Sequence, residues 1–398
     1  MAIKRSPCGG FAYDGDSLFF TNKNGIATLV AIPTIIKVSD YLYEVEYNTY
    51  DYQDGYDYYK QYHQSPSCSA VRKGNIIGRN LDWNYTNGVD FVVKTKATNG
   101  KYATIGVAHT NINQDDILNG RVNDKLLILP FITNDCLNQH GVYANMNVVY
   151  AGDKGVTSGA HKDKQDICQL MLPRYICDYA KTAKEALDLI DDVNVFAPLG
   201  KMNNECHLMV CDENDTYIVE FINNQMKVFS STDDEYDDIP NDKNIITNFY
   251  LSCWNGDIKS VALGDTIEET KATGLNTHAM GLERYNILSE HYDDIATAND
   301  MAEAMESVKF TLAYSEDTTP FWYSEFVDGG LTIYSPQDDF AEIKQKSIEH
   351  YNKHIRDGLT WQTCHTSIYD IDNKQLSVYV DEDYTEKYDF KLNIAGKL

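Results

Sequence analysis

The stretch Cys68-Ser-Ala-Val-Arg-Lys-Gly-Asn-Ile-Ile-Gly-Arg-Asn-Leu-Asp-Trp83 carries the strongest structural signal in this chain. Apolar residues at 70–71 and 76–77 flank the turn-forming run 72–75, which is the pattern of a short β-hairpin. Such a hairpin folds the chain back toward its first residue. The pattern therefore predicts that Arg79 and Asp82 approach Cys68.

A cysteine with charged neighbours is a candidate nucleophile. An unperturbed thiol has a pKa of about 8.5 and is only a few per cent ionised at neutral pH. The guanidinium of Arg79 could lower that pKa, and the carboxylate of Asp82 could hold a proton-carrying base in place. The competing interpretation is a buried structural cysteine beside a surface ion pair, because free cysteines are among the most buried residues.

Further segments downstream combine strand-like residues with polar residues at fixed places. They are Asn138-Gln-His-Gly-Val-Tyr-Ala-Asn-Met-Asn147, His207-Leu-Met-Val-Cys-Asp212, Tyr217-Ile-Val-Glu-Phe221, Ile245-Ile-Thr-Asn248, Gly281-Leu-Glu-Arg-Tyr285 and Thr363-Cys-His-Thr-Ser-Ile-Tyr-Asp370. With the hairpin, and in the same order over about residues 68–398, they resemble the linear amide C–N hydrolases of the choloylglycine hydrolase and acid ceramidase type. That family is a branch of the N-terminal nucleophile (Ntn) hydrolases.

The resemblance implies a fold and a maturation step. The fold would be α+β, a four-layer αββα sandwich with two stacked antiparallel sheets. The nucleophile of such enzymes is the first residue of its chain, and its α-amino group, which titrates near pH 7.7–8.0, is the general base. Cys68 is internal. The resemblance therefore implies autocatalytic cleavage between Ser67 and Cys68, with residues 1–67 as propeptide or N-terminal subunit and residues 68–398 as the catalytic domain.

The resemblance also implies the catalytic roles. Cys68 would attack a linear N-acyl amide to give a thioester, which water hydrolyses. Asp82 would orient the α-amino group, while Arg79 and Arg284 would shape the charge around the sulfur. The turn between Cys68 and Arg79 is shorter than is typical of the family. The register of the two strands therefore decides whether Arg79 and Asp82 occupy the positions that these roles require.

Two asparagines complete the implied site. Asn147 and Asn248 would help to stabilise the tetrahedral oxyanion, as preorganised hydrogen-bond donors do. Taken singly, an asparagine after a strand is more often a turn or cap residue. Their order along the chain with Cys68 favours the catalytic interpretation.

Three alternatives remain open at this stage. An acyltransferase would use the same acyl-enzyme with an amine as acceptor. A non-catalytic binding protein could keep the fold with Cys68 uncut. A papain-like cysteine protease would need a downstream histidine, for which His207 and His365 are candidates without a supporting local motif. Family substrates include bile-salt conjugates, penicillin V and ceramide-like lipids, and the sequence does not select among them.

The composition of the chain limits the classes of partner that it can bind. The 398 residues include 43% hydrophobic residues, enough for a substantial core. A net charge of −26 argues against nucleic acid or an anionic membrane as partner. No apolar run is long enough for a membrane span, and a homo-oligomer is compatible with the sequence. The first residues lack the apolar segment of a secretory signal, which favours a cytoplasmic location unless a leader has been removed.

The cysteines and histidines predict neither a disulfide scaffold nor a metal site. The nine cysteines are an odd number spread over a long chain, and none forms a CxxC pair. His350 and His354 stand four residues apart without the glutamate of a zinc protease helix. The acidic run 233–238 lacks an EF-hand pattern and is typical of a solvated loop. We expect no cofactor.

The remaining elements are predicted from periodicity and end signals. Residues 11–20, 26–38 and 42–47 are predicted as strands, as are antiparallel strands over 207–230 and 366–392. Helices are predicted over 172–180, 282–291, 299–308 and 339–356, and the capping box Thr182-Ala-Lys-Glu185 predicts one that reaches about residue 191. Separate groups of strands and helices indicate an α+β fold.

Overall fold

The computed structural model describes most of the chain. The described residues are 10–14, 17–21, 27–30, 33–47, 67–85, 88–98, 100–110, 129–149, 163–196, 205–222, 224–233, 244–248, 282–309, 324–327, 330–333 and 360–392, with isolated positions 117, 126, 235, 251 and 394. The helix predicted over 339–356 lies outside them.

The predicted hairpin supplies the second and third strands of a six-stranded antiparallel sheet. The strands, in spatial order, are β17 (Ile245–Ile246), β6 (Ser67–Lys73), β7 (Ile76–Tyr85), β20 (Thr360–Asp370), β21 (Gln375–Val380) and β22 (Asp383–Lys391). Cys68 pairs with Leu81, and Ala70 pairs with Arg79. The hairpin prediction is therefore confirmed.

The turn of this hairpin is shorter than the pattern suggested. Strand β6 continues through Lys73, which leaves only Gly74 and Asn75 in the turn. Gly74 has φ +58°, a left-handed conformation that costs glycine little. Arg72 lies within the strand, and its guanidinium donates a 2.5 Å hydrogen bond to Thr216 Oγ1.

A nine-stranded sheet forms the second β layer. Its strands, in spatial order, are β16 (Gln225–Ser230), β15 (Thr216–Ile222), β14 (Glu205–Cys211), β11 (Tyr143–Val149), β10 (Asp135–Asn138), β9 (Thr104–Thr110), β8 (Val89–Thr95), β5 (Leu42–Tyr47) and β4 (Thr34–Lys37). All neighbours are antiparallel except β5 and β8. That parallel pair arises because the β6–β7 hairpin, which lies in the other sheet, intervenes between them in the chain.

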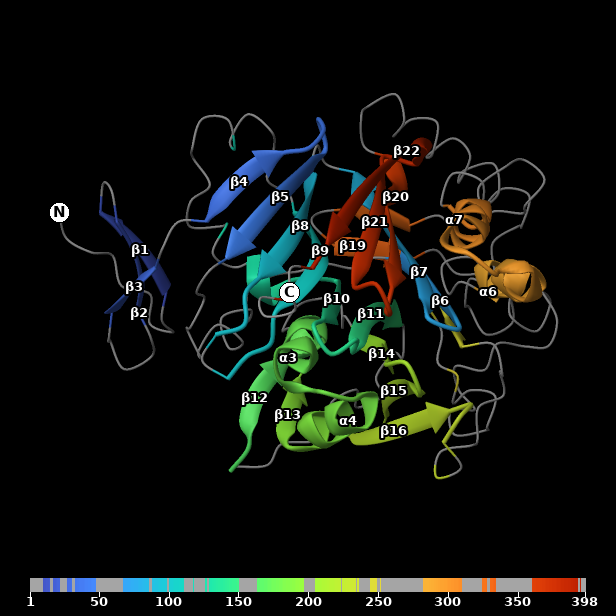
Figure 1. Cartoon of the computed structure of the whole chain (residues 1–398), viewed down its shortest axis with the longest axis horizontal. Coiled ribbons are helices and arrows are strands. Elements are labelled where there is room, and N and C mark those ends of the chain that lie inside the picture. Colours follow the sequence, from blue (N-terminus) through green and yellow to red (C-terminus); the bar gives the residue numbers. More distant parts are fainter. Residues whose placement is uncertain are drawn as a thin grey trace.

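The two sheets stack face to face between helical layers (Figure 1). One apolar cluster joins Ile77 and Val378 of the smaller sheet to Val92 and Ile105 of the larger. Helices α3 (Leu172–Tyr179) and α4 (Ala183–Asp191) pack on the outer face of the nine-stranded sheet. Helices α6 (Leu282–His291) and α7 (Ala298–Ser307) cover the six-stranded sheet. The predicted α+β, four-layer sandwich is confirmed.

Alternation along β7 assigns its side chains to the two faces. Ile77 belongs to the cluster between the sheets, so Arg79 and Leu81 share that face. On the other face, a Cβ on Gly78 would lie 2.7 Å from Met301 Sδ of α7, and Asn80 donates to the Met305 carbonyl of α7 at 2.9 Å. The hairpin thus presents one set of polar groups to the sheet interface and another to the helices.

The N-terminal segment contributes to this core. Strands β4 and β5 form one edge of the nine-stranded sheet. In β5, Tyr43, Val45 and Tyr47 are buried. A separate three-stranded sheet holds β1 (Gly10–Asp14), β2 (Ser17–Thr21) and β3 (Ala27–Val30). Strands 34–37 and 42–47 thus share a sheet with strands that follow Cys68.

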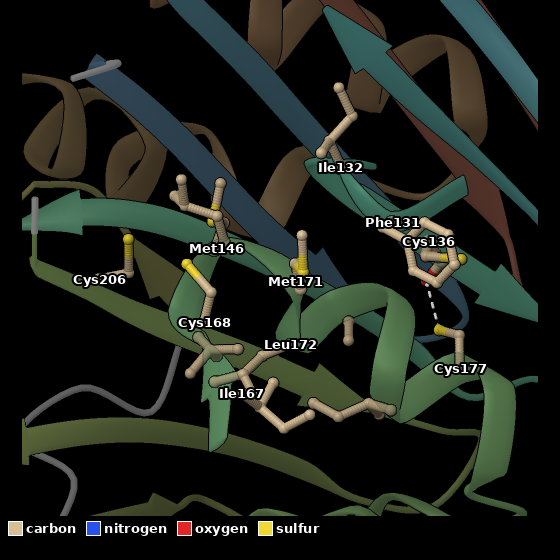
Figure 2. Close-up of a cluster of buried hydrophobic side chains, with 14 of the residues drawn as sticks. Phe131, Ile132, Cys136, Met146, Ile167, Cys168, Met171, Leu172, Cys177 and Cys206 are labelled. Atoms are coloured by element: carbon tan, nitrogen blue, oxygen red, sulfur yellow. Dashed lines mark hydrogen bonds between the residues drawn. The ribbon is translucent and has the colours of Figure 1, made fainter. Parts of the chain in front are cut away.

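Sulfur-containing side chains gather in the layer between α3 and the larger sheet (Figure 2). Cys177 of α3 donates to the carbonyl oxygen of Cys136 at 3.2 Å. Met146 and Met171 belong to the same cluster. The seven cysteines among the described residues are all buried, and none forms a disulfide with another of them.

Other elements agree with the sequence to within a few residues. The residues predicted as helix 172–180, 282–291 and 299–308 form α3, α6 and α7. Thr182 caps α4 by accepting from the Glu185 backbone N–H at 3.1 Å, while the Glu185 carboxylate accepts from the Lys181 backbone. Two small sheets complete the described chain, β12 (Gln165–Cys168) with β13 (Val193–Phe196) and β18 (Ser324–Val327) with β19 (Gly330–Ile333).

Candidate active site

Cys68 and Arg79 meet in the space between the sheets. Cys68 is the second residue of β6, and its Sγ lies 3.3 Å from Nη2 of Arg79. The same Nη2 donates to the Met146 carbonyl at 3.2 Å, and Nη1 lies 3.7 Å from Asp135 Oδ2. Both Cys68 and Arg79 are fully buried. The guanidinium is therefore a fixed positive charge beside the thiol.

Asp82 and Arg284 form an ion pair on the helix-facing side of the same hairpin. Arg284 of α6 donates from Nη1 to Asp82 Oδ2 at 2.7 Å and to Ser69 Oγ at 3.0 Å. Its Nη2 donates to Asn248 Oδ1. The same Asn248 oxygen accepts the backbone N–H of Cys68 at 3.0 Å. The backbone nitrogen of Cys68 is thus linked to Asp82 through Asn248 and Arg284.

The two predicted oxyanion residues tie strands together. Asn248 Nδ2 donates to the Val148 carbonyl at 2.6 Å, and Asn147 Nδ2 donates to the Ile246 carbonyl at 3.1 Å. Asn147 Oδ1 accepts from Asn145 at 3.3 Å. Asn248 thus lies against β6, where it accepts the Cys68 backbone N–H, and Asn147 lies against the neighbouring strand β17. Their donation to an oxyanion stays a prediction.

Burial dominates the ionisation of the thiol and the carboxyl. Burial raises the pKa of Cys68 to about 11, although Arg79 and a hydrogen bond from the Asp82 backbone act to lower it. The expected effect of Arg79 is present, but it does not outweigh desolvation in the uncut chain. Burial likewise raises the pKa of Asp82 to about 6, against the opposing charge of Arg284.

Sequence reasoning missed one polar contact of Asp82. Thr363 of β20 donates from Oγ1 to Asp82 Oδ1 at 2.7 Å, so each carboxylate oxygen accepts from a different side chain. The Thr363 backbone N–H in turn donates to Glu382 Oε1 at 2.8 Å. In the sequence, Thr363 stands out only as the first residue of the segment 363–370, and the family resemblance assigned it no role.

The two candidate protease histidines are engaged elsewhere. His207 has Nδ1 3.3 Å from Glu220 Oε1 and Nε2 2.8 Å from the Thr247 carbonyl. His365 has Nδ1 2.7 Å from Asp90 Oδ1, and that oxygen also lies 3.0 Å from Nδ1 of His109. Neither geometry pairs an imidazole with Cys68, so it does not support a papain-like arrangement.

The described residues also bear on metals and membranes. They contain no group of three or more histidine, cysteine, aspartate or glutamate side chains placed to hold a metal ion. Within the same residues, no helix has both the length and the apolar character needed to cross a bilayer.

The αββα sandwich, with a buried polar cluster at the start of an inner strand, is the fold of the Ntn hydrolase class. Within that class, the chain matches the family of linear amide C–N hydrolases, choloylglycine hydrolase family, over residues 68–298. This match spans more than half of the chain, and the protein belongs to that family. It is therefore a linear amide hydrolase of the amidase and acylase kind.

Solved structures with a similar fold include two such enzymes. A mutant of conjugated bile acid hydrolase from Clostridium perfringens is 13% identical and has a TM-score of 0.43, covering 82% of this chain and 92% of its own. Penicillin V acylase from Agrobacterium tumefaciens is 15% identical and has a TM-score of 0.39, covering 79% of this chain and 83% of its own. No curated protein matches the sequence.

Proposed function

We propose that the protein hydrolyses a linear N-acyl amide through a thioester on Cys68, after cleavage of the Ser67–Cys68 bond. The observation that carries the proposal is the pair of contacts at Cys68. Its sulfur lies 3.3 Å from a buried guanidinium, which stabilises a thiolate. Its backbone nitrogen donates to Asn248 at 3.0 Å, and cleavage would convert that nitrogen into an α-amino group.

Cleavage supplies the base that the uncut chain lacks. With its pKa raised to about 11, the Cys68 thiol is neutral at pH 7 before cleavage. In the proposed step, sulfur adds to the Ser67 carbonyl carbon, the C–N bond breaks and the nitrogen takes the thiol proton. Water then hydrolyses the thioester, which leaves a carboxylate on Ser67 and a free amine and thiol on Cys68.

Turnover follows the same pattern on a substrate amide. The α-amino group takes the thiol proton, sulfur attacks the acyl carbon, and the proton leaves with the amine product. Asp82, fixed by Arg284, orients the α-amino group. Asn147 and Asn248 supply amide donors for the oxyanion. Water then releases the acid and regenerates the thiol.

Intact mass measurement and a substrate panel test this proposal. Purified wild-type chain should resolve into fragments 1–67 and 68–398, whereas Cys68→Ala should stay intact and inactive. Cys211→Ala removes another buried thiol and should cleave and turn over normally. Amidase activity that persists in Cys68→Ala would contradict the proposal.

The panel should vary the acyl and amine halves separately. Conjugated bile acids, penicillin V and N-acyl amines cover bulky, aromatic and linear acyl groups. Adding a competing amine and analysing the products separates hydrolysis from acyl transfer, since a transferase forms a new amide. A stable uncut wild-type chain with no turnover would favour a binding protein.

A further inference from the structure

We propose that Thr363 is a positioning residue that holds the Asp82 carboxylate in its working orientation, with Glu382 acting against it from the next hairpin. This inference rests on the proposed function, because Asp82 matters through the α-amino group that it orients. It adds two residues to the six that the family resemblance implied.

The contacts of Asp82 fix both of its oxygens. Oδ1 accepts from Thr363 and Oδ2 from Arg284, each at 2.7 Å. Thr363 is 1% exposed and Asp82 fully buried, so no solvent competes for these bonds. Hydrogen bonds to an ionised group are about twice as strong as neutral ones. The carboxylate cannot rotate without losing one of them, and each oxygen keeps a further lone pair for an ammonium group.

A β-bulge in β20 makes this contact available. Thr363 pairs with Asp82 and His365 pairs with Leu81, so the register shifts by one residue between them. In a regular strand, residues two apart share a face, but the extra residue Cys364 puts Thr363 and His365 on opposite faces. Thr363 therefore reaches Asp82 on the helix side, while His365 bonds Asp90 of the other sheet.

Thr363 and Glu382 act on Asp82 with opposite signs. Burial raises the pKa of Asp82 to about 6, the charge of Arg284 and the Thr363 hydrogen bond lower it, and the charge of Glu382 raises it. Glu382 lies in the β21–β22 turn and accepts the Thr363 backbone N–H at 2.8 Å. The ionisable groups of the described residues that act on Asp82 or sense its charge include Cys68, Arg79, Arg284, Cys364, Glu382 and Tyr384.

Matched variants distinguish a role of Thr363 in positioning Asp82 from a role in packing alone. Thr363→Val keeps the shape but removes the hydroxyl, Thr363→Ser keeps the hydroxyl, and Glu382→Gln removes the opposing charge. Two readouts apply to each: the pH midpoint of the infrared carboxyl band of Asp82, and kcat/KM on an amide that the wild type hydrolyses, which should fall when Asp82 loses a partner. That band is identified by its loss in Asp82→Asn, and it needs no activity.

Losing the hydroxyl should move the midpoint of the Asp82 band upward by about one pH unit, since a hydrogen bond to a charged group favours its ionised form. Thr363→Ser should match the wild type, and Glu382→Gln should move the midpoint of the Asp82 band downward. An unmoved midpoint in Thr363→Val, or shifts of the same sign in Thr363→Val and Glu382→Gln, would overturn the proposal. If Thr363→Val does not fold, an unmoved midpoint in Glu382→Gln overturns it. If the wild type hydrolyses no amide, the proposed function fails while the infrared titration still decides the role of Thr363.

Discussion

Arg79 Nη2 and Cys68 Sγ lie 3.3 Å apart inside the sheet interface, and the same guanidinium faces Asp135 at 3.7 Å. One cation is thus shared between a thiol and a carboxylate. Asp135 is itself held by Ser367 and by Tyr369, whose hydroxyl donates at 2.8 Å. The thiol therefore sits beside a charge whose position is set by both sheets.

Replacing Arg79 by Met should raise the pKa of the Cys68 thiol, because the charge that opposes desolvation is lost. Thiolate absorbance, measured against a Cys68→Ser background, should then appear at higher pH than in the wild type. Arg72→Met removes another buried arginine from the same strand pair and serves as control. An unchanged thiol titration in Arg79→Met would contradict a role for this guanidinium.

Replacing Asn248 by Ala should slow both cleavage and turnover by roughly 10²–10³-fold, the usual cost of losing a preorganised oxyanion donor. The variant also removes the acceptor of the Cys68 backbone N–H and the partner of Arg284 Nη2. Asn138→Ala is the matched control. Asn138 is equally buried but donates to the Cys177 and Ala180 carbonyls, away from the thiol. Equal rates in the two variants would argue against the role of Asn248.

The local part of the site could be predicted from the sequence. Turn residues and alternation are sufficient to pair β6 with β7, and that pairing alone brings Arg79 to Cys68. Asn248 and Arg284 depended on the family resemblance, since no spacing rule relates positions so far along the chain. In the structure, both residues contact β6 directly.

The non-local part could not be predicted. Thr363 reaches Asp82 across 281 positions, and only after a bulge that no local pattern signals. The direction in which the pKa of Cys68 shifts could not be predicted either, because it depends on how completely the two sheets exclude water from the thiol. The parallel pairing of β5 with β8 was missed because the pattern of each strand does not reveal its partner.

Asp90 provides a pH test of the sheet interface. Burial alone would raise the pKa of Asp90, but His365 and His109, through their charges and hydrogen bonds, lower it below its usual range. A carboxyl with a depressed folded-state pKa stabilises the protein above its unfolded pKa of about 3.9, and that stability is lost as pH falls below it. Urea unfolding from about pH 5 downward should therefore show a loss of stability that Asp90→Asn reduces. Asp188→Asn, at an exposed position of α4, controls for net charge. An unchanged pH slope in Asp90→Asn would contradict the coupling.

The place of β4 and β5 predicts the fate of residues 1–67 once the Ser67–Cys68 bond is cut. These strands close one edge of the nine-stranded sheet, and Val45 is fully buried there. Releasing them would expose β8 and the apolar side chains packed on it, so the fragment should stay bound as an N-terminal subunit. Cut protein should elute from a native sizing column as one species and separate only in denaturant.

Two variants of the N-terminal fragment sharpen this test. Val45→Ala should lower the urea concentration that releases it, since truncating a buried aliphatic side chain costs roughly 1–3 kcal/mol. Ile36→Ala, at a position 53% exposed on the neighbouring strand, should leave release unchanged. Loss of residues 1–67 on the native column would instead make them a released propeptide.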